Sequence, residues 1–237
     1  MIVSHRHKFI FMHLGRTGGR SLTVALARHC GPKDVITETA DLPGRNAEGF
    51  GRHDPARRIR AKVGERVWEE YFKFTFERNP WDKILSRYWA YAGYDQKKGY
   101  KKIYEKLVGH PLGFKNWFFM KVWQGRLLGL GHIRFPRHFH CYTERGRLVV
   151  DFIGRFECRR AHLAILSQRL GLPIDRGVWV GSETRRDRRP YVEFYDERMN
   201  RIVESVFRED LALLGYAFGE PPPTNVIEPR APLRAAA

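Results

Sequence analysis

Two short stretches of the sequence carry residues suited to binding phosphate groups. The first runs from Gly15 to Ser21, between a predicted strand at Lys8–His13 and a predicted helix at Ser21–His29. A glycine-rich turn between a strand and a helix points backbone N–H groups and the positive helix end at one spot, which suits an anion. The side chains and glycines available there are Arg16, Thr17, Gly18, Gly19, Arg20 and Ser21.

This glycine-rich turn differs from the phosphate loop of common ATP-binding enzymes. Counting from Gly15, that pattern needs glycine and lysine where this chain has Arg20 and Ser21. A tight turn that needs its glycines for backbone reasons alone is the alternative interpretation. The arginines beside the glycines favour an anion site.

The second stretch begins with Arg78, directly after a predicted strand at Tyr71–Glu77. A helix is predicted at Trp81–Ala92 with Asn79 as its N-cap, and Ser86 lies about two turns along it. This spacing lets a guanidinium and a hydroxyl converge on one phosphate near the carboxyl edge of the strand. A helix-capping turn with an incidental arginine is the alternative.

The surrounding elements alternate between strands and helices. Further elements are predicted at Ala56–Val63, Leu148–Phe156, Arg159–Leu170 and Glu197–Leu214, the last with a break near Arg208, while Lys33–Arg52 is predicted to be a loop and Asp54 an N-cap. This alternation predicts an α/β fold with a central parallel sheet and helices on both faces. We expect one domain over residues 1–219, with an acceptor-side insertion at about 93–147 and a Pro/Ala-rich disordered tail at 220–237.

Together the two stretches resemble the motifs of the sulfotransferases that use 3′-phosphoadenosine-5′-phosphosulfate (PAPS), in particular the branch that sulfates glycans. The matching residues are His13-Leu14-Gly15-Arg16-Thr17-Gly18-Gly19-Arg20-Ser21 and Phe76-Glu77-Arg78-Asn79-Pro80-Trp81-Asp82-Lys83-Ile84-Leu85-Ser86-Arg87-Tyr88. Asp151–Glu157 and Tyr191–Asp196 also look like the family, so the resemblance spans about residues 8–218.

The resemblance implies a P-loop-like, three-layer fold and transfer of a sulfuryl group from PAPS to a hydroxyl, expected on a carbohydrate, by in-line displacement. The first loop would bind the 5′-phosphosulfate, and Arg78 with Ser86 would bind the 3′-phosphate. The family has lysine where this chain has Arg16. Arginine keeps the positive charge but does not give up a proton at ordinary pH, so Arg16 could stabilise charge without donating a proton.

His53 is the candidate general base for the acceptor hydroxyl. Imidazole has a suitable pKa for this task, and the resemblance places a base histidine between the two phosphate motifs, just before a helix, where His53 stands. A solvated residue at a helix start is the alternative reading of His53. His13, beside the loop, is the alternative base, although a strand histidine more often packs than reacts.

Several other groups have weaker claims to a function. His132, His138 and His140 lie in a basic stretch and could contact the acceptor. The basic, aromatic segment Tyr94–Trp123 either binds the acceptor or is a solvated helix. The arginines of Arg185–Arg189 either reach the 3′-phosphate or lie on a loop without a role in binding.

The composition indicates a soluble, cytoplasmic protein that binds anions. Lys and Arg number 43 against 26 Asp and Glu, a net charge of +17, which suits nucleic acid, anionic membranes, or phosphorylated and sulfated small molecules. Three dispersed cysteines argue against disulfides and zinc, no metal is required, and no apolar run is long enough to span a membrane. A kinase and a nucleic-acid-binding protein remain alternatives, disfavoured by the missing lysine and by the absence of a nucleic-acid motif.

Overall fold

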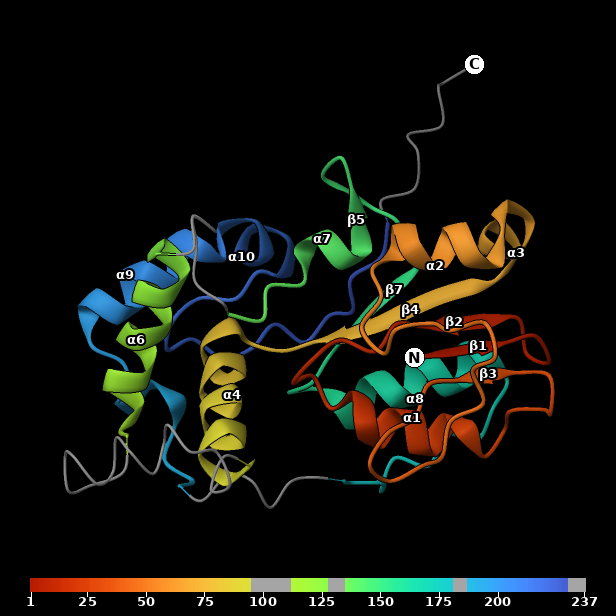
Figure 1. Cartoon of the computed structure of the whole chain (residues 1–237), viewed down its shortest axis with the longest axis horizontal. Coiled ribbons are helices and arrows are strands. Elements are labelled where there is room, and N and C mark those ends of the chain that lie inside the picture. The colour runs from red at the N-terminus through yellow and green to blue at the C-terminus, as the bar shows by residue number, and fades with distance from the viewer. Residues whose placement is uncertain (95–111, 128–134, 181–186, 230–237) are drawn as a thin grey trace. The chain divides into compact units, whose positions relative to one another are not determined.

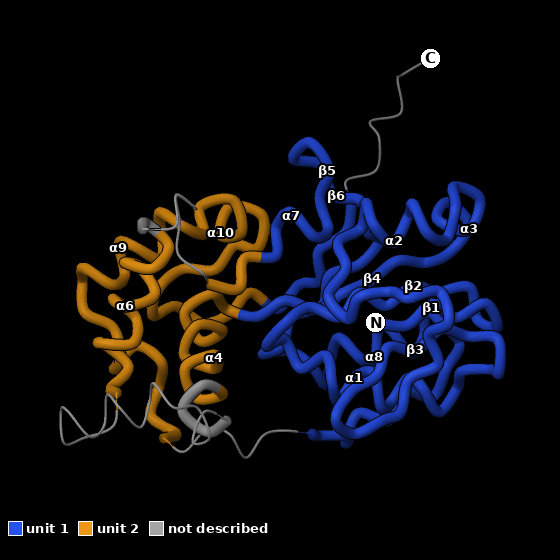
Figure 2. The backbone as a smooth tube through the Cα atoms, in the orientation of Figure 1, with its two compact units in different colours: residues 1–78, 138–180, 224–237 blue, residues 79–137, 181–223 orange. Residues whose placement is uncertain are grey.

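The computed structural model describes residues 1–94, 112–127, 135–180 and 187–229. The chain divides into two compact units (Figure 2), one made of Met1–Arg78, His138–Val180 and Thr224–Ala237, the other of Asn79–Arg137 and Gly181–Pro223. The boundary passes through the second predicted motif, so Arg78 and Ser86 belong to different units. That residues 1–219 form a single domain stays a prediction.

The first unit is built on a five-stranded sheet with the order β3-β1-β2-β4-β7. Its strands are β1 (Ile2–Ser4), β2 (Phe9–Phe11), β3 (Val35–Ile36), β4 (Phe72–Glu77) and β7 (Phe152–Arg155). β2, β4 and β7 run parallel, as the alternation of elements predicted, but β1 is antiparallel to both β2 and β3. The sheet is therefore mixed, which corrects the expectation of a parallel sheet.

The two antiparallel neighbours were not predicted because they are very short. β1 has 3 residues and β3 has 2, and β3 lies inside the stretch expected to be a loop. Asp34 holds this edge together, since its carboxylate accepts hydrogen bonds from the Ser4 hydroxyl at 2.7 Å and from the His5 N–H at 2.8 Å. A contact between residues this far apart leaves no periodic pattern in the sequence.

Helices cover both faces of this sheet. Figure 1 shows α1 (Gly19–Ala27) and α8 (Arg159–Leu170) on one face, and α2 (Ala56–Val63) and α3 (Glu65–Glu70) on the other. The buried core on the first face consists of strand phenylalanines and helix aliphatic residues: Phe9, Phe11, Phe74, Phe76, Phe152, Leu22, Leu26, Leu163 and Leu166. Full burial of each such side chain is worth about 1.5–3 kcal/mol, so this layer fixes the ends of β2 and β4.

The predicted helix ends are largely confirmed. α2 and α8 have the expected bounds, and Gly171 ends α8 in the left-handed conformation at φ 62°. Asn79 accepts hydrogen bonds from the backbone N–H groups of Trp81 and Asp82, at 3.0 and 3.3 Å, and so caps the next helix as predicted. Asp54 does not cap α2, because its carboxylate instead accepts the N–H of Gly51 at 2.7 Å.

Small elements complete the first unit. α7 (Phe139–Tyr142) leads into a two-stranded antiparallel sheet of β5 (Thr143–Glu144) and β6 (Arg147–Leu148). The predicted strand at Leu148–Phe156 is therefore divided between β6 and β7. Near the C-terminus, Ile227 exchanges two backbone hydrogen bonds with Ile153 of β7, so the first part of the predicted tail is paired with the sheet.

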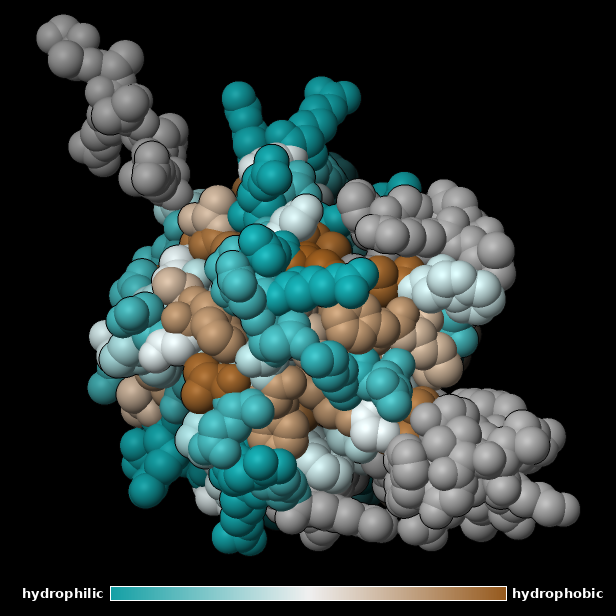
Figure 3. Space-filling model, turned by 90° about the vertical axis from the view of Figure 1, so that its left-hand side faces the viewer, coloured by the Kyte–Doolittle hydropathy of each residue, from teal (hydrophilic) through white to brown (hydrophobic). Residues whose placement is uncertain are grey.

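The second unit is helical. It contains α4 (Pro80–Tyr94), α6 (Phe114–Leu127), the 3-10 helix η3 (Tyr191–Phe194), α9 (Glu197–Val206) and α10 (Arg208–Leu214), with the predicted break at Phe207. Aromatic side chains fill its interior, where the Tyr195 hydroxyl donates to the Trp81 carbonyl at 2.8 Å. Its outer face carries mainly hydrophilic side chains with apolar groups between them (Figure 3). Among the described residues, no helix combines the length and apolar character needed to cross a membrane.

Candidate functional site

The Gly15–Ser21 loop joins the end of β2 to the start of α1, as predicted. Gly18 is the N-cap of α1 and has a left-handed backbone with φ 79°, while Arg16 is also left-handed at φ 67°. An arginine in this conformation costs about 1–3 kcal/mol, and such strain is typical of functional sites. The first N–H groups of α1 have no acceptor within the helix, so they are available to an anion.

The glycines of the loop are required by close packing. A Cβ atom at Gly19 would lie 2.1 Å from Cδ2 and 2.4 Å from Nε2 of the His13 ring. A Cβ atom at Gly18 would lie 3.0 Å from the Phe156 ring. The loop is also tied internally, since the Thr17 hydroxyl donates to the Leu14 carbonyl at 3.1 Å. Steric need therefore accounts for these glycines, and the role of the loop in anion binding stays a prediction.

His13 is a packed histidine. Its ring is buried against Gly19, and burial together with nearby positive charges lowers its pKa well below the usual 6.5. Nδ1 lies 3.5 Å from the hydroxyl of Thr23, which donates to the Gly19 carbonyl at 2.8 Å. The ring thus supports the start of α1, in agreement with the expectation that a strand histidine packs.

His53 lies directly beside His13 and is exposed. The two rings make an edge-on contact with centroids 5.0 Å apart, and His53 Nδ1 lies 2.7 Å from the His13 carbonyl oxygen. A carbonyl only accepts, so Nδ1 carries the proton and Nε2 carries the lone pair of the neutral ring. This is the tautomer that a general base at Nε2 requires.

Arg78 connects the second motif to the loop. Its Nη1 lies 3.4 Å from the Arg16 carbonyl oxygen, and its guanidinium carbon lies 4.2 Å from the centre of the Phe156 ring. Because Phe156 also contacts Gly18, the aromatic ring fixes the guanidinium next to the start of α1. Within the first unit, the structure thus brings together Arg16, Gly18 and Arg78.

Two predicted phosphate ligands have protein partners. Arg20 makes a bidentate ion pair with Asp41, with Nε and Nη2 each 2.7 Å from a carboxylate oxygen. The Ser21 hydroxyl accepts the N–H of Val180 at 2.9 Å and is buried. The sequence did not single out Asp41, because it lies in a polar stretch without a motif.

The remaining predicted residues fall outside this cluster. Ser86 lies on α4 in the second unit and is buried, so its convergence with Arg78 on one phosphate stays a prediction. Arg189 pairs with Asp187 at 2.7 Å. The predictions for His132, Arg185, Arg186 and residues 95–111 concern positions outside the described residues.

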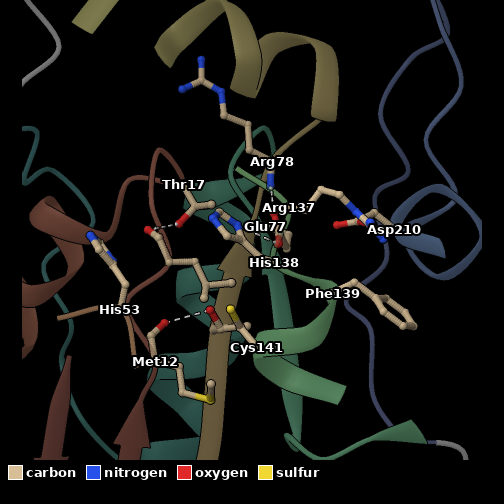
Figure 4. Close-up of polar contacts among 12 residues, drawn as sticks. Met12, Thr17, His53, Glu77, Arg78, Arg137, His138, Phe139, Cys141 and Asp210 are labelled. Atoms are coloured by element: carbon tan, nitrogen blue, oxygen red, sulfur yellow. Dashed lines mark hydrogen bonds and ion pairs between the residues drawn. The ribbon is translucent and has the colours of Figure 1, made fainter. Parts of the chain in front are cut away.

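A buried acid–histidine pair adjoins the loop, and the sequence did not indicate that these two residues pair. Glu77, the last residue of β4, is fully buried, and its Oε1 lies 3.1 Å from Nδ1 of His138 (Figure 4). His138 Nε2 lies 3.8 Å from the position that a Cβ atom of Gly15 would take. The available signal was an acidic residue immediately before Arg78, at the carboxyl end of a strand. Among the described residues, no three His, Cys, Asp or Glu side chains gather as a metal site.

Comparison with known proteins agrees with the two motifs. The chain matches the model of the sulfotransferase family over residues 1–217, a range that includes both motifs and His53. It is also similar to an uncharacterized protein of Archaeoglobus fulgidus, with 30% identity over 131 residues that cover 54% of this chain and 91% of that protein. No solved structure matches the chain. The extent of the family match shows that this chain belongs to the sulfotransferase family.

Proposed function

We propose that this protein transfers a sulfuryl group from PAPS to a hydroxyl of a carbohydrate, with the Gly15–Ser21 loop as a P-loop-like binding site. The observation that supports this best is the 3.4 Å approach of Arg78 Nη1 to the Arg16 carbonyl, because it joins the two phosphate-binding motifs. A donor with phosphate groups at both its 5′ and 3′ positions needs two neighbouring anion sites of this kind.

Each residue of the site has a proposed task toward the donor. The N–H groups at the start of α1, with Arg16, Thr17, Gly18, Gly19, Arg20 and Ser21, bind the 5′-phosphosulfate. Arg78 binds the 3′-phosphate together with Ser86. Asp41 offsets part of the charge of Arg20, so we assign to Arg16 the larger share of the electrostatic attraction toward the 5′-phosphosulfate.

The proposed reaction is an in-line displacement at sulfur. His53 takes the proton of the acceptor hydroxyl at Nε2, because Nδ1 donates to the His13 carbonyl. General-base assistance of this kind contributes about 10²–10⁴ in rate. Arg16 and the N–H groups of the loop stabilise the charge that grows on the departing nucleotide.

A carbohydrate acceptor is favoured by exposed aromatic surface next to the loop. Trp179 is 51% exposed, and the guanidinium carbon of Arg159 lies 4.6 Å from its ring centre. The N–H of the following residue, Val180, donates a hydrogen bond to the hydroxyl of Ser21 near the start of α1. An aromatic face backed by a cation suits a sugar ring that carries acidic groups.

The three cysteines, all free thiols, suit a reducing compartment, and we propose the cytoplasm.

The proposal is tested by incubating the protein with sulfur-labelled PAPS and a panel of glycans and small hydroxylated compounds. We expect label in a glycan fraction and none without the protein. Thermal-shift measurements with 3′,5′-ADP, ATP–Mg²⁺ and an oligonucleotide distinguish the alternatives. Stabilisation by ATP–Mg²⁺ or by the oligonucleotide, with none by 3′,5′-ADP, would contradict the proposal.

A further inference from the structure

The buried pair of Glu77 and His138 is the strongest feature near the loop to which the proposed reaction gives no task. Glu77 Oε1 faces His138 Nδ1 at 3.1 Å, and Glu77 Oε2 accepts the N–H of Arg78 at 3.1 Å. Burial of a carboxylate is costly unless hydrogen bonds or a charge compensate it. A carboxylate held in this way fixes the orientation of the imidazole and favours its protonated form.

The orientation of the ring points its other nitrogen at the loop. His138 Nε2 lies 3.8 Å from the Cβ position of Gly15, an ordinary contact distance, so the ring rests against the loop backbone. Figure 4 shows the ring of His138 facing Glu77. The Nε2 edge of the ring therefore faces Gly15, the first residue of the loop that we propose as the site of the 5′-phosphosulfate.

The departing group in sulfuryl transfer needs a proton donor or a strong hydrogen-bond donor. The bond between sulfur and the 5′-phosphate oxygen breaks, and its electron pair moves onto that oxygen. Arg16 offsets the charge but keeps its proton, because a guanidinium does not deprotonate at ordinary pH. A protonated imidazole both donates a hydrogen bond and gives up a proton near neutral pH.

We propose that His138, held by Glu77, is the general acid that protonates the departing 5′-phosphate oxygen. This inference rests on the proposed function. The proton moves from His138 Nε2 to the 5′-phosphate, while the acceptor proton moves to His53 Nε2. The protein neither gains nor loses a proton overall, and exchange with water returns both rings to their starting forms.

A charged group in contact with His138 is the Glu77 carboxylate at the end of β4, and it favours the protonated ring. His140 lies on α7, the short helix that His138 precedes as N-cap, and is exposed. A bound 5′-phosphosulfate adds negative charge at Nε2, so donor binding shifts the balance toward the protonated ring.

The test compares the pH dependence of kcat for PAPS-dependent transfer in wild type, His138→Gln and the control His29→Gln. Glutamine keeps a hydrogen bond to Glu77 but cannot titrate, and His29 follows the end of α1 that is remote from the loop. We expect a bell-shaped profile in wild type. In His138→Gln we expect kcat to fall by about 10²-fold and the alkaline limb to disappear, while the Kd for 3′,5′-ADP rises far less than kcat falls.

Three results overturn the inference. Wild-type kcat in His138→Gln, an unchanged alkaline limb, or loss of the acidic limb instead would each show that His138 is not the acid. If the wild type transfers no label from PAPS, the proposed function fails and this inference fails with it. If the wild type transfers the label and His138→Gln does so with the same kcat, the inference about His138 is refuted while the proposed function stands.

Two further measurements distinguish the loss of a proton donor from a folding defect in His138→Gln. Adding Arg16→Lys to His138→Gln should restore part of the lost kcat, because a lysine can donate a proton where arginine cannot. In the wild type, the imidazole nitrogen signals of His138 should move toward those of a protonated ring when 3′,5′-ADP is added at neutral pH. No rescue and no movement of these signals would contradict the assignment.

Discussion

The Nδ1 atom of His53 lies 2.7 Å from the backbone carbonyl oxygen of His13, and this contact determines which nitrogen of His53 can accept a proton. His13 is itself held against Gly19 of the loop. The proposed base and the loop are therefore both in contact with one residue, His13, which lies shortly after β2.

Replacement of His53 by glutamine should abolish general-base assistance while leaving donor binding intact. We expect kcat to fall by about 10²–10⁴, because the acceptor hydroxyl then keeps its proton until late in the reaction. The Kd for 3′,5′-ADP, measured by titration calorimetry, should stay at its wild-type value. A kcat within a few-fold of wild type would show that another group is the base.

Replacement of Gly19 by alanine should destabilise the protein and disrupt the loop. The new Cβ atom would overlap the His13 ring, and overpacking of this kind costs about 1–3 kcal/mol. The measurement is the free energy of unfolding in urea, together with the affinity for 3′,5′-ADP. Gly113→Ala is the matched control, because a Cβ atom there meets nothing within 4 Å. Equal stability of the two variants would contradict the packing account.

Asp41 should weaken donor binding through its ion pair with Arg20. Its side chain is 25% exposed, and its carboxylate accepts hydrogen bonds from Nε and Nη2 of Arg20, so it lowers the positive charge offered to an anion. Asp41→Asn should therefore tighten binding of 3′,5′-ADP several-fold at low salt, and less at high salt because of screening. Arg20→Ala should weaken the same binding. Weaker binding in Asp41→Asn would show that the pair is needed to shape the loop.

The stability of the fold should decrease below about pH 6.5, because buried histidines resist protonation. Burial, reinforced by positive neighbours, lowers the pKa of His13 well below 6.5, and burial also lowers the pKa of His162. The unfolded chain then binds more protons, so stability falls as pH drops through 6.5, by at most about 1.4 kcal/mol per pH unit for each histidine. Urea unfolding of wild type and His13→Gln checks this. The same pH dependence in both proteins would contradict the assignment to His13.

The sequence predicted the elements with clear patterns and missed the contacts between distant residues. β4 and α8 follow from apolar runs and a terminal glycine, which are local signals. β1 and β3 have too few residues to show a pattern, and their pairing made the sheet mixed. In the site, the loop and Arg78 were predictable from residue type and spacing. The partners Asp41 and His138 were not, because tertiary packing brought them to Arg20 and Glu77.

Binding of the nucleotide product tests the central claim most directly. Affinities of wild type and Arg78→Ala for 3′,5′-ADP and for 5′-AMP form a cycle in which either the guanidinium or the 3′-phosphate is removed. We predict that wild type prefers 3′,5′-ADP by about 1.5–3 kcal/mol, the value of a charged hydrogen bond, and that Arg78→Ala loses this preference. If both proteins bind the two nucleotides equally, or if Arg78→Ala keeps the full preference, then Arg78 does not bind the 3′-phosphate and the proposed donor site is wrong.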